Sequence, residues 1–199
     1  CLTLDAKISP KRERNIRNDY VGPVSPNYAH LDLGTHSWKF AADAPASPSD
    51  IRDQATTWTD LEWLAGQTKM PIVVKGIMTG VDGRAATDSG AKAIIVSNHG
   101  ARYLDTTFTT IEVLPEVVEQ VDGKAEVYLD GGIRRGSDIF KALALGARSV
   151  LLGRALFWGL AVDGEAGVSP MLEILPDHLA ATIGMCGRAT VDSIYRSAE

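Results

Sequence analysis

The stretch "AEVYLDGGIRRGSDIFKALALGARSVLLGR", residues 125–154, holds two short apolar runs separated by a helix-like segment at 136–147. The first run ends in an aspartate and two glycines, and the second ends in Gly153 and Arg154. Short runs rich in Leu, Ile and Val that alternate with amphipathic segments are typical of βα units with parallel strands. This stretch therefore predicts an α/β fold.

The same alternation extends towards the N-terminus. Three more strand-like runs, "CLTLD" (1–5), "PIVVKG" (71–76) and "KAIIVSNHG" (92–100), alternate with helix-like segments at 56–68, 79–91 and 110–121. Gly90 and Gly146 stand where helices should end, and Thr59 or Asp60 is expected near the start of the helix at 56–68. Residues of about 21–57 lack a sustained period and predict a long loop excursion.

The positions of the glycines favour one parallel architecture over another. A doubly wound sheet usually carries G-x-G-x-x-G after its first strand, and the sequence has no such motif. Its glycines follow the last two strands, as in the phosphate site after strands seven and eight of a (β/α)8 TIM barrel. We therefore predict that residues 1–199 are the C-terminal part of a single barrel domain, about strands 4–8. The N-terminal part is expected on the same or another chain.

Composition excludes several classes of partner. The 199 residues carry a formal net charge of −5, which argues against nucleic acid. No apolar run approaches the roughly 20 residues of a membrane helix, so no membrane partner is expected. The two cysteines provide no disulfide framework and suit a reducing compartment, so a cytoplasmic location is predicted.

Polar or basic residues end all five predicted strands. In a barrel the C-terminal strand ends converge on one opening, where residues distant in sequence meet. Each residue alone is weak evidence, but five successive strands ending in such groups predict an active site. The converging set is Thr3, Asp5, Lys75, Ser97, His99, Arg102, Asp130, Gly153 and Arg154.

These motifs match a known family. "SNHGARYLD" (97–105) resembles the active-site signature of the FMN-dependent L-2-hydroxy acid oxidases and dehydrogenases, and "PIVVKGI", "VYLDGGIRRGSDIFKALALGA" and "LLGRALFWGLAVDGEAGV" resemble their barrel segments. "LTLDA", "KRERNIRN" and "TWTDLEWL" match upstream family segments. The resemblance implies FMN-dependent oxidation of an L-2-hydroxy acid, glycolate- or lactate-like, with O2 reduced to H2O2. It also implies a homotetramer and allows a peroxisomal location, although the C-terminus is not Ser-Lys-Leu.

The resemblance assigns a role to each matching residue and implies no metal. His99 matches the base, and Asp5 the carboxylate that orients it. Arg12 and Arg102 match the guanidinium groups that hold the substrate carboxylate, and Lys75 the cation beside flavin N1. Thr3 and Ser97 match ring or ribityl contacts, Asp130 matches a ribityl contact, and the residues matching the phosphate site are Gly131, Gly132, Arg134, Gly153 and Arg154.

Other interpretations stay open. Tyr103 stands where the family commonly has glutamine, which leaves the identity of the hydroxy acid open. The acceptor could be a quinone or cytochrome, as in the dehydrogenases, or the chain could be a non-catalytic flavin- or phosphate-binding fragment. A phosphate-binding barrel with a catalytic cysteine is disfavoured, because Cys186 lies far past the last strand and is expected to be a buried small residue.

Overall fold

The computed structural model describes residues 1–7, 10, 12–20 and 56–195. The predicted excursion at about 21–57 therefore lies outside the described residues, apart from its last two positions. The described strands are β1 (Leu2–Thr3), β2 (Val73–Ile77), β3 (Ala93–Val96), β4 (Glu126–Leu129) and β5 (Ser149–Val150). The helices are α1 (Glu13–Arg17), α2 (Trp58–Gln67), α3 (Gly80–Asp88), α4 (Thr110–Val121), α5 (Gly136–Ala144) and α6 (Arg154–Met185).

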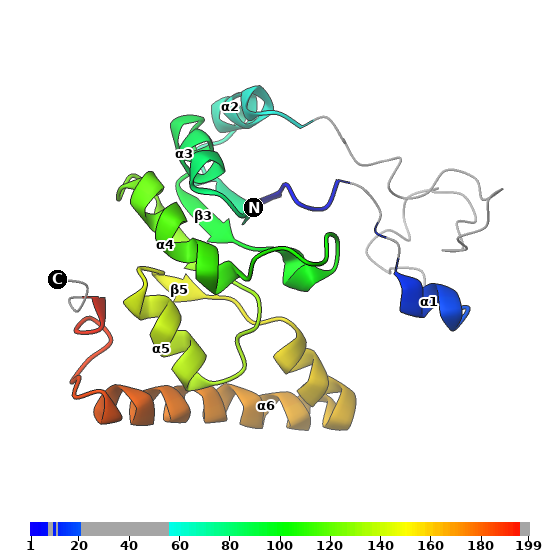
Figure 1. The fold of residues 1–199 in the computed structure, drawn as a ribbon, viewed down its shortest axis with the longest axis vertical. Helices are drawn as coiled ribbons and strands as arrows, with labels where there is room; N and C mark the ends of the chain where they lie inside the picture. Colours follow the sequence, from blue (N-terminus) through cyan, green and yellow to red (C-terminus); the bar gives the residue numbers. More distant parts are fainter. Residues whose placement is uncertain (8–9, 11, 21–55, 196–199) are drawn as a thin grey trace.

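The five strands form one sheet in the order of the sequence. Neighbouring strands are parallel throughout, and the order is β1-β2-β3-β4-β5. A parallel neighbour requires a crossover connection, and α3, α4 and α5 supply three of them. Figure 1 shows these three helices one after another along the sheet, with α6 crossing below them. The expected βα repeat is confirmed.

The hydrophobic core lies between the sheet and these helices. Each central strand contributes a fully buried residue to the core: Val74 from β2, Ile94 from β3 and Leu129 from β4. Leu114 and Val117 of α4 close the core from the helix side. Because successive side chains of a strand point to opposite faces, Thr3, Lys75, Ser97 and Asp130 belong to the face turned away from this core.

Strand β2 interrupts this alternation at one residue. The register with β3 shifts between Lys75 and Ile77, so that Gly76 is an additional residue in the pairing. Val74 and Ile77 are both buried in the core although they are three residues apart. Gly76 has φ +104°, which side-chain-bearing residues rarely adopt. A β-bulge of this kind redirects nearby side chains and is common next to active sites.

Helix boundaries follow local hydrogen bonds. Helix α2 begins after Thr57, whose backbone N–H donates to the Asp60 carboxylate at 2.7 Å, so Thr59 and Asp60 both lie in the first turn, near the start of the helix as expected. This carboxylate satisfies a backbone donor that the helix leaves unpaired. Gly90 and Gly146 have φ +105° and +100° just after α3 and α5, which confirms the predicted C-terminal glycines.

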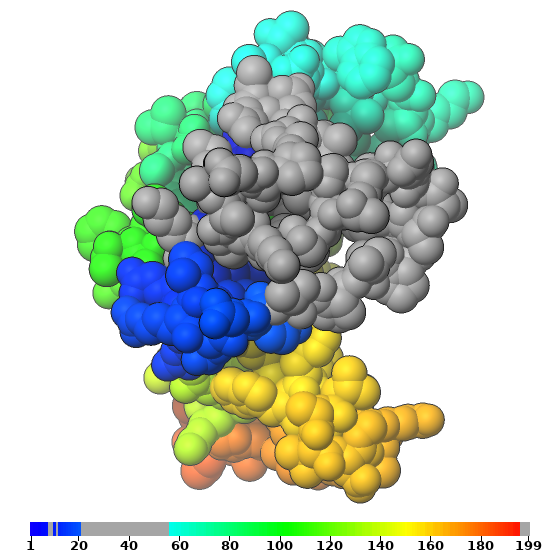
Figure 2. All heavy atoms as spheres, turned by 90° about the vertical axis from the view of Figure 1, so that its right-hand side faces the viewer, coloured from blue at the N-terminus to red at the C-terminus, as the bar shows by residue number. Residues whose placement is uncertain are grey.

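The bounds of the helix after β5 were not predicted. Helix α6 spans Arg154–Met185 and is broken at Asp163 and Gly164, where the backbone is not helical. Its later part packs against α5, whereas its first turns lie at the surface below α1 in Figure 2. Cys186 follows α6 and is exposed, so the expectation of a buried thiol is wrong. None of the helices in the described ranges is both long and apolar enough to span a membrane.

Candidate functional site

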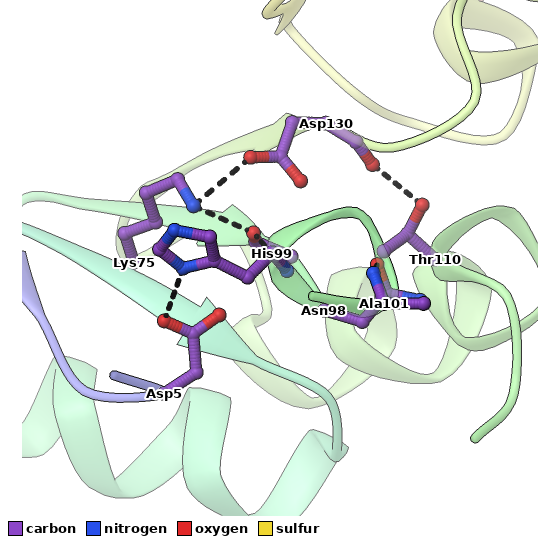
Figure 3. Close-up of polar contacts among 8 residues, drawn as sticks. Asp5, Lys75, Asn98, His99, Ala101, Thr110 and Asp130 are labelled. Carbon is purple, nitrogen blue, oxygen red and sulfur yellow. Dashed lines mark hydrogen bonds and ion pairs between the residues drawn. The ribbon is translucent and has the colours of Figure 1, made fainter. Parts of the chain in front are cut away.

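The C-terminal ends of four adjacent strands bring five of the predicted side chains together. Asp5 follows β1 by two residues, Lys75 lies in β2, Ser97 and His99 follow β3, and Asp130 follows β4. Figure 3 shows the side chains of Asp5, Lys75, His99 and Asp130 meeting at one edge of the sheet. Residues far apart in the sequence are neighbours here because all strands of a parallel sheet end on the same side.

Asp5 and His99 form a hydrogen-bonded pair. Asp5 Oδ1 lies 3.0 Å from His99 Nδ1, and their side chains are 15% and 30% exposed (Figure 3). An ionised carboxylate has no proton to donate, so in this contact the proton is on His99 Nδ1. In the neutral ring, Nε2 is then the nitrogen that can accept a proton. Among the described residues, His99 Nε2 has no hydrogen-bond partner. The ring is therefore arranged to accept a proton at Nε2.

The backbone of the His99 loop is held in an unusual conformation. His99, Gly100 and Ala101 have φ +56°, +64° and +58°, so three successive residues are left-handed. Such a conformation costs a non-glycine residue about 1–3 kcal/mol and persists only where neighbouring contacts hold it. Ser97 Oγ accepts the His99 backbone N–H at 3.1 Å, and Asn98 Oδ1 accepts the Ala101 backbone N–H at 3.3 Å.

Lys75 occupies the centre of the group. Its Nζ donates to Ser97 Oγ at 2.8 Å and lies 3.1 Å from Asp130 Oδ2. The Lys75 and Asp130 side chains are 19% and 16% exposed, so the pair is largely removed from water. Thr110 Oγ1 donates to the Asp130 backbone carbonyl at 2.5 Å, which anchors this aspartate to the first residue of α4.

Two carboxylate oxygens at this edge have no partner. Asp5 Oδ2 and Asp130 Oδ1 are buried and accept no hydrogen bond within the described part of the chain. A buried acceptor without a donor is costly, so each unpaired oxygen indicates a donor that comes from elsewhere. The hydroxyl groups of a sugar-like ribityl chain are donors of the required kind for Asp130.

The loops after β4 and β5 form a more open, basic cradle. A Cβ added at Gly132 or Gly153 would meet no atom within 4 Å, so space for a ligand lies against both backbones. Arg134 and Arg154 are exposed and carry the positive charge. Backbone N–H groups beside glycines, together with guanidinium groups, suit a phosphate monoester. The donors present therefore fit the phosphate of FMN.

Local contacts hold these loops in place. The Asp138 carboxylate accepts the backbone N–H groups of Arg134 and Arg135, each at 3.0 Å. The Arg134 guanidinium lies 5.7 Å from the centre of the Trp158 ring, and Arg154 Nη2 donates to the Gly100 carbonyl at 2.8 Å. Arg154 therefore connects the cradle to the His99 loop.

The predicted substrate clamp is not assembled from the described residues. Arg12 precedes α1, which lies away from the strand ends in Figure 1, and neither Arg12 nor Arg102 has a side-chain hydrogen bond or ion pair with a described residue. Arg102 is exposed and follows the His99 turn directly. Thr3 is exposed opposite Lys75 in the β1–β2 register and makes no side-chain contact with the network.

Sequence reasoning missed several contacts of this site. The Tyr103 ring lies edge-on to His99 at 4.6 Å between ring centres, and Trp158 lies under Arg134. Trp158 stands four residues after Arg154, one turn along α6. This spacing was the available signal that Trp158 lies on the same side of the helix as a predicted phosphate-site residue. A cavity of about 450 Å³ beside β1 and β2 is lined by Leu2, Leu4, Trp58, Leu61, Gly76 and others, and its lining does not include Asp5, Lys75, Ser97, His99 or Asp130.

Comparison with known proteins gives consistent matches. The chain is 46% identical over 203 residues to L-lactate oxidase of Nostoc sp. (strain PCC 7120 / SAG 25.82 / UTEX 2576), which covers 99% of this chain and 55% of that protein. It is 45% identical over 199 residues to glycolate oxidase 3 of Oryza sativa subsp. indica, covering 98% and 54%. A peroxisomal (S)-2-hydroxyacid oxidase of Arabidopsis thaliana is 42% identical over 196 residues, covering 98% and 54%.

Solved structures agree with these relatives. A crystal structure of mandelate oxidase with benzoyl-formic acid superposes with a TM-score of 0.80 at 36% identity, covering 98% of this chain and 52% of that one. The chain thus spans about half the length of the proteins it matches, and its five parallel strands are part of their TIM barrel. A family model described as FMN-dependent dehydrogenase matches residues 1–198. The chain therefore belongs to the FMN-dependent dehydrogenase family.

Proposed function

We propose that the protein oxidises an L-2-hydroxy acid, glycolate- or lactate-like, to the 2-oxo acid with O2 as the final electron acceptor. FMN, when bound, supplies the acceptor for the hydride from the substrate Cα. The observation that carries the proposal is the Asp5–His99 pair, which leaves Nε2 as a base at the strand ends beside the Lys75 network. Family membership and three relatives named as hydroxy acid oxidases support the same chemistry.

His99 acts as the general base of this proposal. Its Nε2 takes the proton of the substrate hydroxyl, so that the C–O double bond forms as Cα loses its hydride. Asp5, 3.0 Å from Nδ1, holds the ring in the required tautomer and stabilises the imidazolium that results. Arg102 and Arg12 bind the substrate carboxylate through their planar forks, with Arg102 on the same loop as the base.

The other residues would hold the cofactor. The Lys75 ammonium would stabilise negative charge on the flavin ring. Ser97 and Thr3 would contact the ring or ribityl chain, and Asp130 would accept a ribityl hydroxyl at Oδ1, which is buried and has no partner among the described residues. The residues that would bind the phosphate are Gly131, Gly132, Arg134, Gly153 and Arg154.

The remaining proposals concern the assembly. We propose a homotetramer whose barrel is completed by the three strands that relatives carry beyond the matched half. A reducing compartment, the cytoplasm, agrees with two cysteines that form no disulfide.

His99→Ala tests the central assignment. Flavin reduction by L-lactate, glycolate and (S)-mandelate is followed anaerobically by loss of yellow colour in the full-length protein. The variant should keep FMN, because the phosphate contacts lie elsewhere, and slow reduction about 10²–10⁴-fold. His178→Ala in α6 is the matched control and should reduce at the normal rate.

Each outcome separates the alternatives. Normal reduction in His99→Ala would contradict the base assignment. A wild-type protein that binds FMN but is bleached by none of the three acids would be a flavin-binding fragment without activity. Stopped-flow reoxidation by air then distinguishes an oxidase, which reoxidises rapidly, from a dehydrogenase that requires a quinone or cytochrome.

A further inference from the structure

Gly76 lies unusually close to Asp5, the partner of His99. A Cβ built on Gly76 would come within 2.8 Å of three Asp5 atoms, its backbone N, Cβ and Cγ. Real Cβ atoms essentially never approach other heavy atoms below 3.0 Å. Two of these three atoms belong to the Asp5 side chain itself, so any side chain at residue 76 would displace the carboxylate.

Backbone contacts hold Asp5 close to Gly76. The Leu4 N–H donates to the Lys75 carbonyl at 2.8 Å, which fixes the β1 chain against β2 just before Asp5. The bulge between Lys75 and Ile77 then turns Gly76 to φ +104°. Asp5 fits against β2 at this point because residue 76 presents only hydrogen there.

We propose that Gly76 is a positioning residue for the base: its missing side chain creates the space from which Asp5 reaches His99 Nδ1. The inference deepens the proposed function, on which its mechanistic meaning rests. Gly76 acts through Asp5 and touches neither substrate nor cofactor in this proposal. Among the described residues, the ionisable groups near the His99 ring are Asp5 from the segment after β1, Lys75 from β2, Asp130 from the loop after β4, and Tyr103 from the loop of His99 itself (Figure 3).

The direct readout is the tautomer of the neutral His99 ring. Long-range ¹⁵N–¹H NMR at alkaline pH distinguishes a proton on Nδ1 from one on Nε2, and the His99 signal is assigned by its loss in His99→Ala. The wild-type ring should carry the proton on Nδ1, because Asp5 accepts it. Gly76→Ala should shift the population to Nε2–H, and flavin reduction should slow about 10²-fold because the base is misplaced.

Gly90→Ala is a matched control. Gly90 has φ +105°, nearly the value of Gly76, but its added Cβ would face the Ala65 side chain at 3.2 Å, far from Asp5. It imposes the same backbone strain and should leave the His99 tautomer unchanged. If Gly90→Ala shifted the tautomer as much as Gly76→Ala does, general destabilisation would be the cause and the proposal would be wrong.

A double-variant cycle tests whether Gly76 acts through Asp5. In an Asp5→Asn background, Gly76→Ala should change the tautomer no further, because the acceptor has already been altered. An additional shift of equal size would overturn the inference. Should Gly76→Ala not fold, the wild-type protein still provides the test, since nuclear Overhauser contacts between Gly76 Hα and Asp5 Hβ are required and their absence would refute the geometry.

The tautomer is measured without substrate, so the two proposals can fail separately. A protein that shows the expected tautomer shifts but no flavin reduction by any hydroxy acid would support the role of Gly76 in placing Asp5 while refuting the proposed activity. An active oxidase whose His99 tautomer is unchanged by Gly76→Ala would support the proposed activity and refute the role of Gly76 in placing Asp5.

Discussion

The strand ends fall into two regions of different character. At the ends of β1–β4 the polar side chains bond to one another: Asp5 to His99, and Lys75 to both Ser97 and Asp130. At the ends of β4 and β5, two glycines face open space and two arginines are exposed. The first region is organised by contacts among its own side chains, whereas the second presents exposed guanidinium groups and open backbone at Gly132 and Gly153 to an anion.

This difference has a physical reason. A base and its carboxylate must keep a fixed geometry while charge moves, so neighbours within the chain hold them. A phosphate carries its own charge and can organise exposed guanidinium groups when it binds. Substitutions in the first region should therefore reduce stability and chemistry, whereas substitutions in the second should reduce cofactor affinity.

The largest expected effect is on stability at the centre of the bonded region. Lys75→Met leaves the Asp130 carboxylate largely buried without its cation, so the free energy of unfolding should fall by about 2–4 kcal/mol. Lys124→Met is the control, because the Lys124–Asp88 pair is 3.6 Å long and more than half exposed, and its loss should cost under about 1 kcal/mol. Urea unfolding measures both losses. If they were equal, the Lys75–Asp130 pair would stabilise the fold no more than an exposed surface pair does.

The cradle should respond in affinity for phosphate. Arg154→Ala removes a charge-assisted contact of about 1.5–3 kcal/mol, so the dissociation constant for FMN should rise about 10–100-fold. Riboflavin, which lacks the phosphate, should bind the variant and the wild type almost equally. Fluorescence titration with both flavins provides the measurement, and Arg148→Ala at the other end of β5 is the control. A parallel loss of riboflavin affinity would place Arg154 outside a phosphate site.

Arg102 tests the boundary between the two regions, since it is exposed but follows the His99 turn. Arg102→Lys keeps the charge and loses the bidentate fork, so the KM for the hydroxy acid should rise about tenfold with a fall in kcat. Steady-state kinetics on Arg148→Lys provides the reference. Unchanged kinetics with every acid tested would remove Arg102 from the site.

The smallest effect is expected outside both regions, at the start of α4. The pKa of Glu112 is lowered from its usual 4.5 because the Thr109 hydroxyl and backbone N–H donate to its ionised carboxylate. A lowered folded-state pKa contributes stability above pH 4.5 that disappears as the pH falls through the folded value. Glu112→Gln should therefore be slightly less stable than wild type at pH 7 and equal to it in acid. Thermal melts at both pH values, with the exposed Glu119→Gln as control, measure the difference.

Much of the fold was predictable because its signals are local. The strand runs, the helices at 79–91, 110–121 and 136–147, and the glycines after two of them depend on periodicity and on backbone preference. The extent of helix α6 was not predicted, because its sequence from Arg154 to Met185 contains four glycines and two prolines, which weaken a helical prediction. The exposure of Cys186 was also mispredicted, since burial depends on what packs nearby.

The residues of the site were predictable, and so was the Asp5–His99 pair that the resemblance implied, but most of the other contacts were not. The sequence shows a polar or basic residue at the end of each of the five strands. These ends lie on one side of the sheet because the strands are parallel. The edge-on contact of Tyr103 with His99, the anchoring of Asp130 by Thr110 and the link from Arg154 to Gly100 join residues 4, 20 and 54 positions apart. Spacing alone does not indicate such contacts unless they fall on one helical turn or one strand face.

The sequence by itself determined the family, the parallel βα order and the set of residues that end the strands, because these depend on residue type and local pattern. The resemblance also implied that Asp5 orients His99, and the structure shows this contact. Only the tertiary structure decided the other relations: Lys75 with Asp130, and Gly76 as the space that admits Asp5. The reason is that a bulge at one glycine shifts the register of β2, and such a shift is set by the packing of whole strands.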